Sequence, residues 1–163
     1  MTAHGSGPAS AEARVRELGI QIPTLPPPVA IYVPAVRTGD LVFASGQTPT
    51  VDGVLQVQGK LGGEVSIEQG QQAARLAALN CVAEVRGLLG SLDRVARIVR
   101  LTGFVASATG FAQQPAVVNG ASQLIEEVFG EAGRHARSAI GVAELPGGAP
   151  VEIELIVAAR EGA

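Results

Sequence analysis

The sequence predicts an α+β domain in which two long helices pack on one face of a mixed β-sheet. Residues 66–90 and 115–130 carry apolar residues at helical spacing, and both stretches end at glycines. Runs rich in β-branched residues occupy 29–45, 95–106 and 137–159. The resulting order is two strands, a helix, a strand, a helix and two strands, which indicates helices layered on one sheet. We expect the other sheet face to be open and to be buried in an oligomer.

The first pair of strands is predicted at Val29–Val36 and Leu41–Ser45. Thr38-Gly39-Asp40 between them supplies a turn, so the pair forms a hairpin. Residues 46–63 are loop-like, with a second turn at Asp52-Gly53 and a short strand at 54–57.

The first long helix begins at Ser66, because Ser66 and Gln69 have the spacing of a capping box. Gly90 ends it, and Val95–Ala106 follows as a long strand. Its predicted apolar stripe consists of Leu76, Leu79, Val82 or Ala83, and Val85.

The second long helix begins near Pro115, a residue favoured in the first turn, and ends at Gly130. Strands are predicted at 137–143 and 151–159, with a turn at 145–149, so we expect a hairpin over His135–Val157. The buried face of the second helix is predicted to hold Val118, Ala121, Leu124 or Ile125, and Val128.

Composition limits the protein class. The 163 residues fit one domain with a real core, and a hydrophobic content of 47% excludes a disordered chain. Charged residues make up only 17%, which we interpret as apolar surface that a partner subunit covers. The net charge of −3, without a basic block, gives no electrostatic support for nucleic-acid binding.

The chain is expected to be cytoplasmic and not associated with a membrane. Its single cysteine rules out a disulfide framework within the chain, no apolar run reaches about 20 residues, and the N-terminus lacks a signal-peptide pattern. We expect residues 1–20 to be a flexible N-terminus with a short helix at Ala11–Leu18, capped by Ser10. Residues 21–163 then form a single domain.

Several kinds of site are absent from the sequence. No His, Cys and carboxylate cluster has metal-ligand spacing, and no phosphate-binding loop or GxSxG motif is present. Cys81 lies among alanines and valines, which predicts a packed core cysteine.

Two residues stand out as candidates for chemistry. Arg137 lies in a strand among small and apolar residues, so it either binds an anion or extends to solvent from a sheet edge. Glu152 shares a strand face with Glu154, and it is either functional or paired with Arg97 or Arg100. In a hairpin turning at 145–149, Arg137 and Glu152 are about 17 Å apart along the strands. We therefore expect them to meet around one ligand only between subunits.

Three segments resemble the RidA (YjgF) family, whose members have also been labelled endoribonuclease L-PSP. They are LVFASGQTP at 41–49, ARSAIGVAELP at 136–146 and VEIEL at 151–155. The resemblance runs from about Val29 to Ala159 in one register, and the extra N-terminal segment is similar to a longer subgroup of the family.

The resemblance implies a chorismate-mutase-like α+β subunit, a homotrimer with clefts between subunits, and hydrolysis of enamine and imine intermediates such as 2-aminoacrylate to 2-keto acids and ammonia. It implies no metal and no cofactor. By motif, Arg137 corresponds to the arginine that binds the substrate carboxylate and Glu152 to the acid that positions or activates water. The remaining substrate-binding positions implied are Tyr32, Gly46, Ala139 and Asn119.

Two other functions remain open at this point. The same cleft can serve a non-catalytic module that binds a keto acid or a similar metabolite. An endoribonuclease is the third hypothesis, and the acidic balance, the 3% aromatic content and the lack of a histidine pair argue against it.

Overall fold

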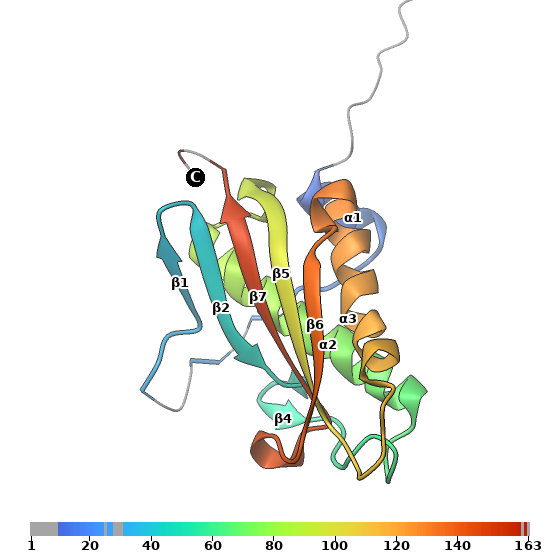
Figure 1. Ribbon diagram of the computed structural model, residues 1–163. Helices are drawn as coiled ribbons and strands as arrows, with labels where there is room; N and C mark the ends of the chain where they lie inside the picture. Colours follow the sequence, from blue (N-terminus) through green and yellow to red (C-terminus); the bar gives the residue numbers. More distant parts are fainter. Residues whose placement is uncertain (1–9, 25, 28–30, 161, 163) are drawn as a thin grey trace, which may run out of the picture.

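A five-stranded sheet forms the centre of the computed structural model, which describes residues 10–24, 26–27, 31–160 and 162. The strand order is β1-β2-β7-β5-β6 (Figure 1). β5 and β6 run parallel and the other neighbours run antiparallel, so the predicted mixed sheet is confirmed. The strands are β1 Ala35–Thr38, β2 Leu41–Gln47, β5 Val95–Ala106, β6 Ala136–Val142 and β7 Val151–Ala159.

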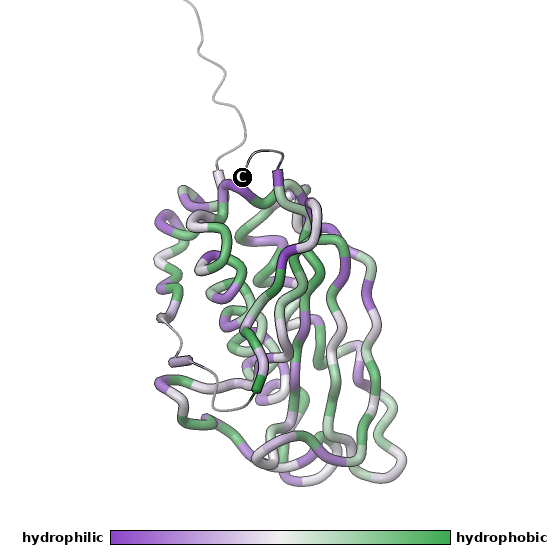
Figure 2. The backbone as a smooth tube through the Cα atoms, turned by 90° about the vertical axis from the view of Figure 1, so that its left-hand side faces the viewer, coloured by the Kyte–Doolittle hydropathy of each residue, from purple (hydrophilic) through white to green (hydrophobic). Residues whose placement is uncertain are grey.

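Two long helices, α2 (Ile67–Leu89) and α3 (Gln114–Phe129), cover one face of this sheet, as predicted. Figure 2 shows the helices and the strands as two layers. α2 begins at the Ser66–Gln69 capping box and ends at Gly90, whose φ of 81° is the left-handed conformation that favours glycine. α3 has Pro115 in its first turn.

The predicted apolar stripe of α3 is buried, but that of α2 is partly wrong. Leu76 and Leu79 are only half-buried, whereas the alanines beside them and Val82 and Val85 are buried. α2 packs closely on α3, since a Cβ at Gly120 of α3 would overlap the backbone of Gln71. Leu76 does not face this contact and instead lines a pocket with Pro49, Val51 and Val57.

The predicted hairpin over His135–Val157 is wrong. β6 and β7 are both formed, yet β5 lies between them and pairs with each. The connection contains a 3-10 turn, η3 (Pro146–Gly148), and passes the end of β5, where Ala106 N donates to Pro150 O and Ser107 N donates to Val142 O. A direct hairpin needs only a short turn, whereas this connection is long enough to pass over one strand.

The predicted first hairpin is present, but its first strand is placed too early: β1 begins at Ala35 and includes Thr38, and residues 31–34 are not strand. The turn predicted at Asp52-Gly53 is confirmed, and the short strand predicted at 54–57 is limited to Val54–Leu55. β1 and β2 pair around Gly39, and the small hairpin of β3 (Thr50–Val51) and β4 (Val54–Leu55) turns at Asp52-Gly53. Both turn residues have positive φ, 50° and 77°, as a tight hairpin turn requires. The predicted strand residues 29 and 30 lie outside the described residues.

The predicted N-terminal helix is present as α1 (Ala11–Glu17), capped by Ser10. It is tied to the domain through Glu12, which accepts hydrogen bonds from Arg86 at 2.9 and 3.1 Å and from Leu92 N at 3.0 Å. The flexibility expected for residues 1–9 falls outside the described residues. No helix in the described part of the chain is long and apolar enough to cross a bilayer.

The sheet face opposite the helices is uncovered and largely apolar. Val36, Leu41, Phe43 and Ile140 are between 38% and 52% exposed there. The strand registers place Phe104 and Ile156 on the same face. An exposed group of apolar side chains is typical of a surface that contacts a partner.

Candidate functional site

Glu152 lies on the open face of the central strand β7. Its neighbours Val151 and Ile153 are buried against the helices, so alternation directs Glu152 to the other side, opposite Phe104 of β5. The Glu152 carboxylate covers Gly46 of β2, where a Cβ would overlap Glu152 Oε1. A side chain at position 46 would therefore displace the carboxylate.

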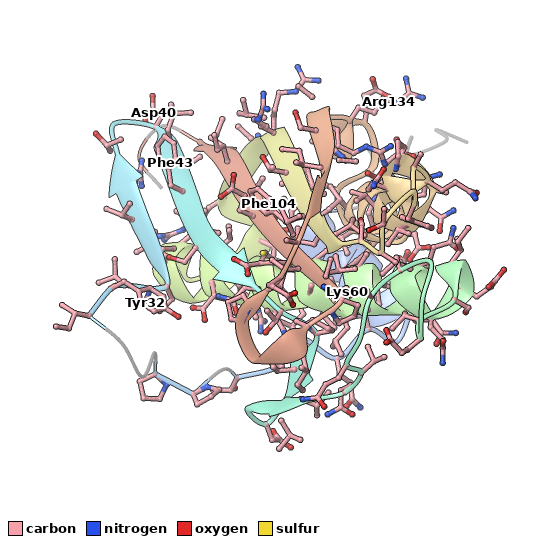
Figure 3. The ribbon with its side chains drawn as sticks, turned by 60° about the horizontal axis from the view of Figure 1, so that its bottom comes forward. Tyr32, Asp40, Phe43, Lys60, Phe104 and Arg134 are labelled. Atoms are coloured by element: carbon pink, nitrogen blue, oxygen red, sulfur yellow. The ribbon has the colours of Figure 1, made fainter. Side chains whose placement is uncertain are left out.

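Tyr32 is held near the same end of β2. Ser45 N donates to Pro34 O at 2.8 Å and Ser45 Oγ donates to Val33 O at 2.7 Å, which fixes the segment after Tyr32 against β2. Tyr32 is 51% exposed, and Figure 3 shows it below the start of β1. We refer to Gly46 and Glu152, together with Tyr32 on the segment bonded to Ser45, as the Glu152 half-site.

Asn80 of α2 fixes the loop that follows Gly46, a role that the sequence did not indicate. Asn80 is fully buried, and its Nδ2 donates to Thr48 O and Thr50 O, both at 3.0 Å. No sequence pattern identifies such a contact, because its partners are backbone carbonyls about 30 residues away.

The environment of Glu152 raises the pKa of its carboxyl group, chiefly because burial removes water and also because Glu154 adds a like charge. The alternative of an ion pair with Arg97 or Arg100 is wrong for the described residues. Arg100 instead donates to Ser138 Oγ at 2.7 Å. Glu152 is thus a half-buried carboxyl group without a partner cation in the described part of the chain.

Arg137 lies on the helix-covered face of the edge strand β6. It is opposite Leu101, a buried residue of that face, and its guanidinium contacts α3. Nη1 donates to Asn119 Oδ1 at 2.8 Å and to Ser122 Oγ at 3.1 Å, while Nη2 donates to Pro115 O at 3.4 Å. The alternative of an arginine that extends freely to solvent is therefore wrong.

The donors left on Arg137 indicate what it can bind. A guanidinium has five N–H groups. Both on Nη1 and one on Nη2 are taken, so Nε–H and the second Nη2–H have no acceptor in the described residues. When Pro115 O accepts the Nη2 hydrogen that faces Nη1, those two groups share one edge of the guanidinium plane, the geometry that binds a carboxylate through two parallel hydrogen bonds.

Asn119 and Ala139 lie with Arg137, and their role in substrate binding stays a prediction. Asn119 bonds to it directly, and Ala139, two residues along β6, packs its methyl group against the core. Sequence reasoning missed Ser122, although it follows Asn119 by three residues and so shares its helix face. Asn119, Ser122, Arg137 and Ala139 form the Arg137 half-site.

One chain does not bring the two half-sites together. Arg137 is level with Leu101 and Glu152 with Phe104, three residues along β5, and β5 itself lies between their strands. This amounts to about 10 Å along the sheet and about 10 Å across it. The two side chains also point to opposite faces. The two residues therefore do not meet within one chain, as predicted, but the predicted separation of about 17 Å along the strands is wrong because it assumed the hairpin.

The described residues contain no group of three or more His, Cys, Asp and Glu side chains that can hold a metal ion. Cys81 is buried in the core, as predicted, and its Sγ donates to Ile153 O at 3.0 Å. Burial raises the pKa of this thiol far above its ordinary value, so it is not a reactive group.

Comparison with known proteins gives a consistent result. Residues 12–150 match the family model described as "YjgF/chorismate mutase-like, putative endoribonuclease". The chain is 46% identical over 146 residues to Protein TCP17 of Trypanosoma cruzi, covering 89% of this chain and 91% of that protein. It is 30% identical over 138 residues to a 2-iminobutanoate/2-iminopropanoate deaminase of Dermatophagoides farinae, covering 85% and 93%.

Among solved structures, the fold is similar to that of Atu1372, a protein of unknown function from Agrobacterium tumefaciens. The TM-score is 0.85 at 44% sequence identity, and the match covers 92% of each chain. The similarity thus extends over most of both chains.

Proposed function

The chain belongs to the YjgF/chorismate mutase-like family, and from this membership we propose that it hydrolyses enamine and imine intermediates of α-amino acids to 2-keto acids and ammonia. The 2-imino acid is the reacting form. Water adds to its C=N carbon, and the C–N bond of the resulting carbinolamine breaks to release ammonia. No redox partner is needed, since the substrate is already electrophilic.

The observation that carries this proposal is the free edge of Arg137. Asn119, Ser122 and Pro115 fix the guanidinium and leave Nε–H and one Nη2–H for a planar anion. Every α-imino acid and every 2-keto acid carries a carboxylate beside the reacting carbon. A carboxylate held at two points places that carbon at a fixed distance from the arginine.

Glu152 is the second member of the proposed site and handles the proton. A base must be ionised to take a proton from water, yet it works best with a pKa near the working pH. Burial and Glu154 both move the pKa of Glu152 in that direction. Gly46 leaves room for the carboxylate, and the segment after Tyr32 is bonded to Ser45, the residue before Gly46.

A complete site requires two copies of the chain in this proposal. Arg137 and Glu152 point to opposite faces of one sheet, so an arginine of one copy acts with a glutamate of its neighbour. The apolar open face, with Phe43 and Phe104 (Figure 3), supplies the surface that the copies bury. We propose a homotrimer with one cleft at each boundary.

The test generates imino acids with an amino-acid oxidase in the presence of the purified protein. We expect imine decay to the keto acid to accelerate for several amino acids. No acceleration with any of them, combined with tight binding of keto acids, favours the binding module. Cleavage of RNA by highly purified protein, lost in Arg137→Ala, favours the ribonuclease.

The shared site has its own test. Arg137→Ala and Glu152→Gln should each lose most of the activity, but chains of the two variants mixed and reassembled together should regain it at about one site in four by random assortment. Separate assembly of the two variants before mixing is the control. Full inactivity of the reassembled mixture contradicts a site built from two copies.

A further inference from the structure

His135 and Ser122 form a hydrogen-bonded pair behind Arg137. His135 precedes β6 by one residue, and its Nε2 lies 3.0 Å from Ser122 Oγ. The other ring nitrogen, Nδ1, bonds to Gly133 O. Ser122 Oγ is also the atom that accepts from Arg137 Nη1 at 3.1 Å. A continuous path therefore runs from Gly133 through His135 and Ser122 to the guanidinium.

The direction of each bond follows from its partner. A carbonyl oxygen only accepts, so Nδ1 carries the proton in the His135–Gly133 bond. In the neutral ring Nε2 is then an acceptor, and it takes the hydroxyl proton of Ser122. The Ser122 hydroxyl is thereby turned toward His135, and its lone pairs remain available to Arg137.

We propose that Ser122 and His135 are positioning residues that hold the guanidinium of Arg137 with its Nε/Nη2 edge presented to a substrate carboxylate. This inference rests on the function proposed above. A serine inside a helix otherwise bonds back to the carbonyl one turn earlier, which turns its lone pairs elsewhere. His135 removes that alternative. Ser122 and Asn119 together then occupy both hydrogens of Nη1.

A serine beside a histidine is also the arrangement of a nucleophile and its base. The contacts of Ser122 argue against that role. Its oxygen already accepts from a cationic donor, which lowers its electron density, and it lies half-buried between α3 and β6. Ser122 acts on the substrate through Arg137 and not by direct attack.

The test compares removal of each group with a replacement that keeps the hydrogen bond. Ser122→Ala should raise KM for an imino acid about tenfold with kcat within about twofold, and Ser122→Thr should restore KM. His135→Ala should raise KM by a smaller factor, and His135→Gln, whose Oε1 can accept from Ser122, should restore it. Gln123→Ala, at the exposed next position of α3, is the matched control.

A spectroscopic measurement follows the same contact without turnover. The chain has two histidines, His4 and His135, so ring ¹⁵N spectra are simple to assign with His4→Ala. We expect the Nδ1–H tautomer at His135, and its Nε2 resonance should move when 2-ketobutyrate binds. In Ser122→Ala the ligand-dependent shift should be lost.

The outcomes separate the two proposals. Wild-type protein that neither binds 2-ketobutyrate nor accelerates imine decay overturns the proposed function and this inference with it. Wild-type activity with an unchanged KM in Ser122→Ala overturns the inference alone. So does a His135→Gln variant as impaired as His135→Ala. Covalent labelling of Ser122 by a fluorophosphonate, with loss of activity, overturns it in favour of a nucleophile.

Discussion

The Arg137 half-site and the Glu152 half-site lie on opposite faces of one sheet. They differ in how many partners the chain itself supplies to the charged group. Arg137 has three of its five N–H groups bonded by its own chain and keeps one edge free. Glu152 has no cation beside it in the described residues and has Glu154 as a neighbour. The arginine is held in place before any ligand arrives, whereas the glutamate is held in an unfavourable environment.

This difference indicates how the work is divided. A rigid guanidinium loses little freedom on binding, so it contributes affinity and orientation. A carboxylate with a raised pKa is less stable as an anion, so it contributes reactivity toward a proton. Replacement of Arg137 itself should change binding and turnover together, and replacement of Glu152 should change turnover alone.

The largest effect is expected at Arg137. Arg137→Ala removes two charge-assisted hydrogen bonds to the substrate, and we expect kcat/KM to fall by about 10³-fold or more. Arg137→Lys keeps the charge without the fork and should recover only part of this loss. Steady-state kinetics and calorimetry with 2-ketobutyrate measure both effects. Arg134→Ala, an exposed arginine three residues away, should change neither.

The next effect is at Glu152. Glu152→Gln removes the proposed base, and we expect kcat to fall by about 10²- to 10³-fold with keto-acid affinity nearly unchanged. The same variant should melt slightly higher at neutral pH, since it removes a buried charge whose pKa is raised. If the affinity for the keto acid fell by the same factor as kcat, the proposed division of roles between the two half-sites would be contradicted.

Residue types, helix capping and side-chain alternation account for the elements that were predicted correctly. β-branched residues define β5 with its observed ends, and Ser66 with Gln69 defines the start of α2. The faces of β7 follow from alternation. The neighbours of β7 do not, because a period of two fixes the side on which each residue lies and not the strand beside it. The hairpin prediction failed for this reason.

Site residues that are recognisable from the residue types of one segment were predicted. Site residues that depend on contacts between elements were missed. Arg137 and Glu152 were identified from strand patterns and from a family resemblance. Ser122 and Asn80 were not, because their partners come from other elements and their own residue types are common on helices. The half-burial of Leu76 was missed for the same reason, since the residues beside it, Pro49, Val51 and Val57, come from another part of the chain.

A smaller effect is expected at Gly46. In Gly46→Ala the new methyl group overlaps Glu152 Oε1, the end of a flexible side chain, so the fold adapts while the carboxylate moves. We expect kcat to fall about tenfold, because a displaced base loses its alignment, with little change in melting temperature. Gly87→Ala, with open space around its Cβ, serves as the control and should raise stability by up to about 1 kcal/mol.

The smallest effect is a shift in pH dependence on replacing Glu154. The raised pKa of Glu152 places the acid limb of kcat at a higher pH than an ordinary glutamate would, since activity requires the ionised base and falls as pH falls through that pKa. Glu154→Gln removes the like charge but not the burial, which is the larger cause. The acid limb should therefore move to lower pH without reaching the ordinary glutamate position.

The free energy of unfolding should also depend on pH differently in Glu154→Gln. A carboxyl group whose folded pKa lies above its unfolded value stabilises the fold below the unfolded value, and this contribution is lost as pH rises through the folded one. Glu154→Gln reduces that loss, so the variant should gain stability relative to wild type as pH rises from acid to neutral. Glu84→Gln is the control, because burial raises the pKa of Glu84, which belongs to neither half-site. Glu84→Gln should change stability and leave the pH profile of kcat unchanged. An equal shift of that profile in Glu84→Gln and Glu154→Gln would show that its acid limb does not report the ionisation of Glu152.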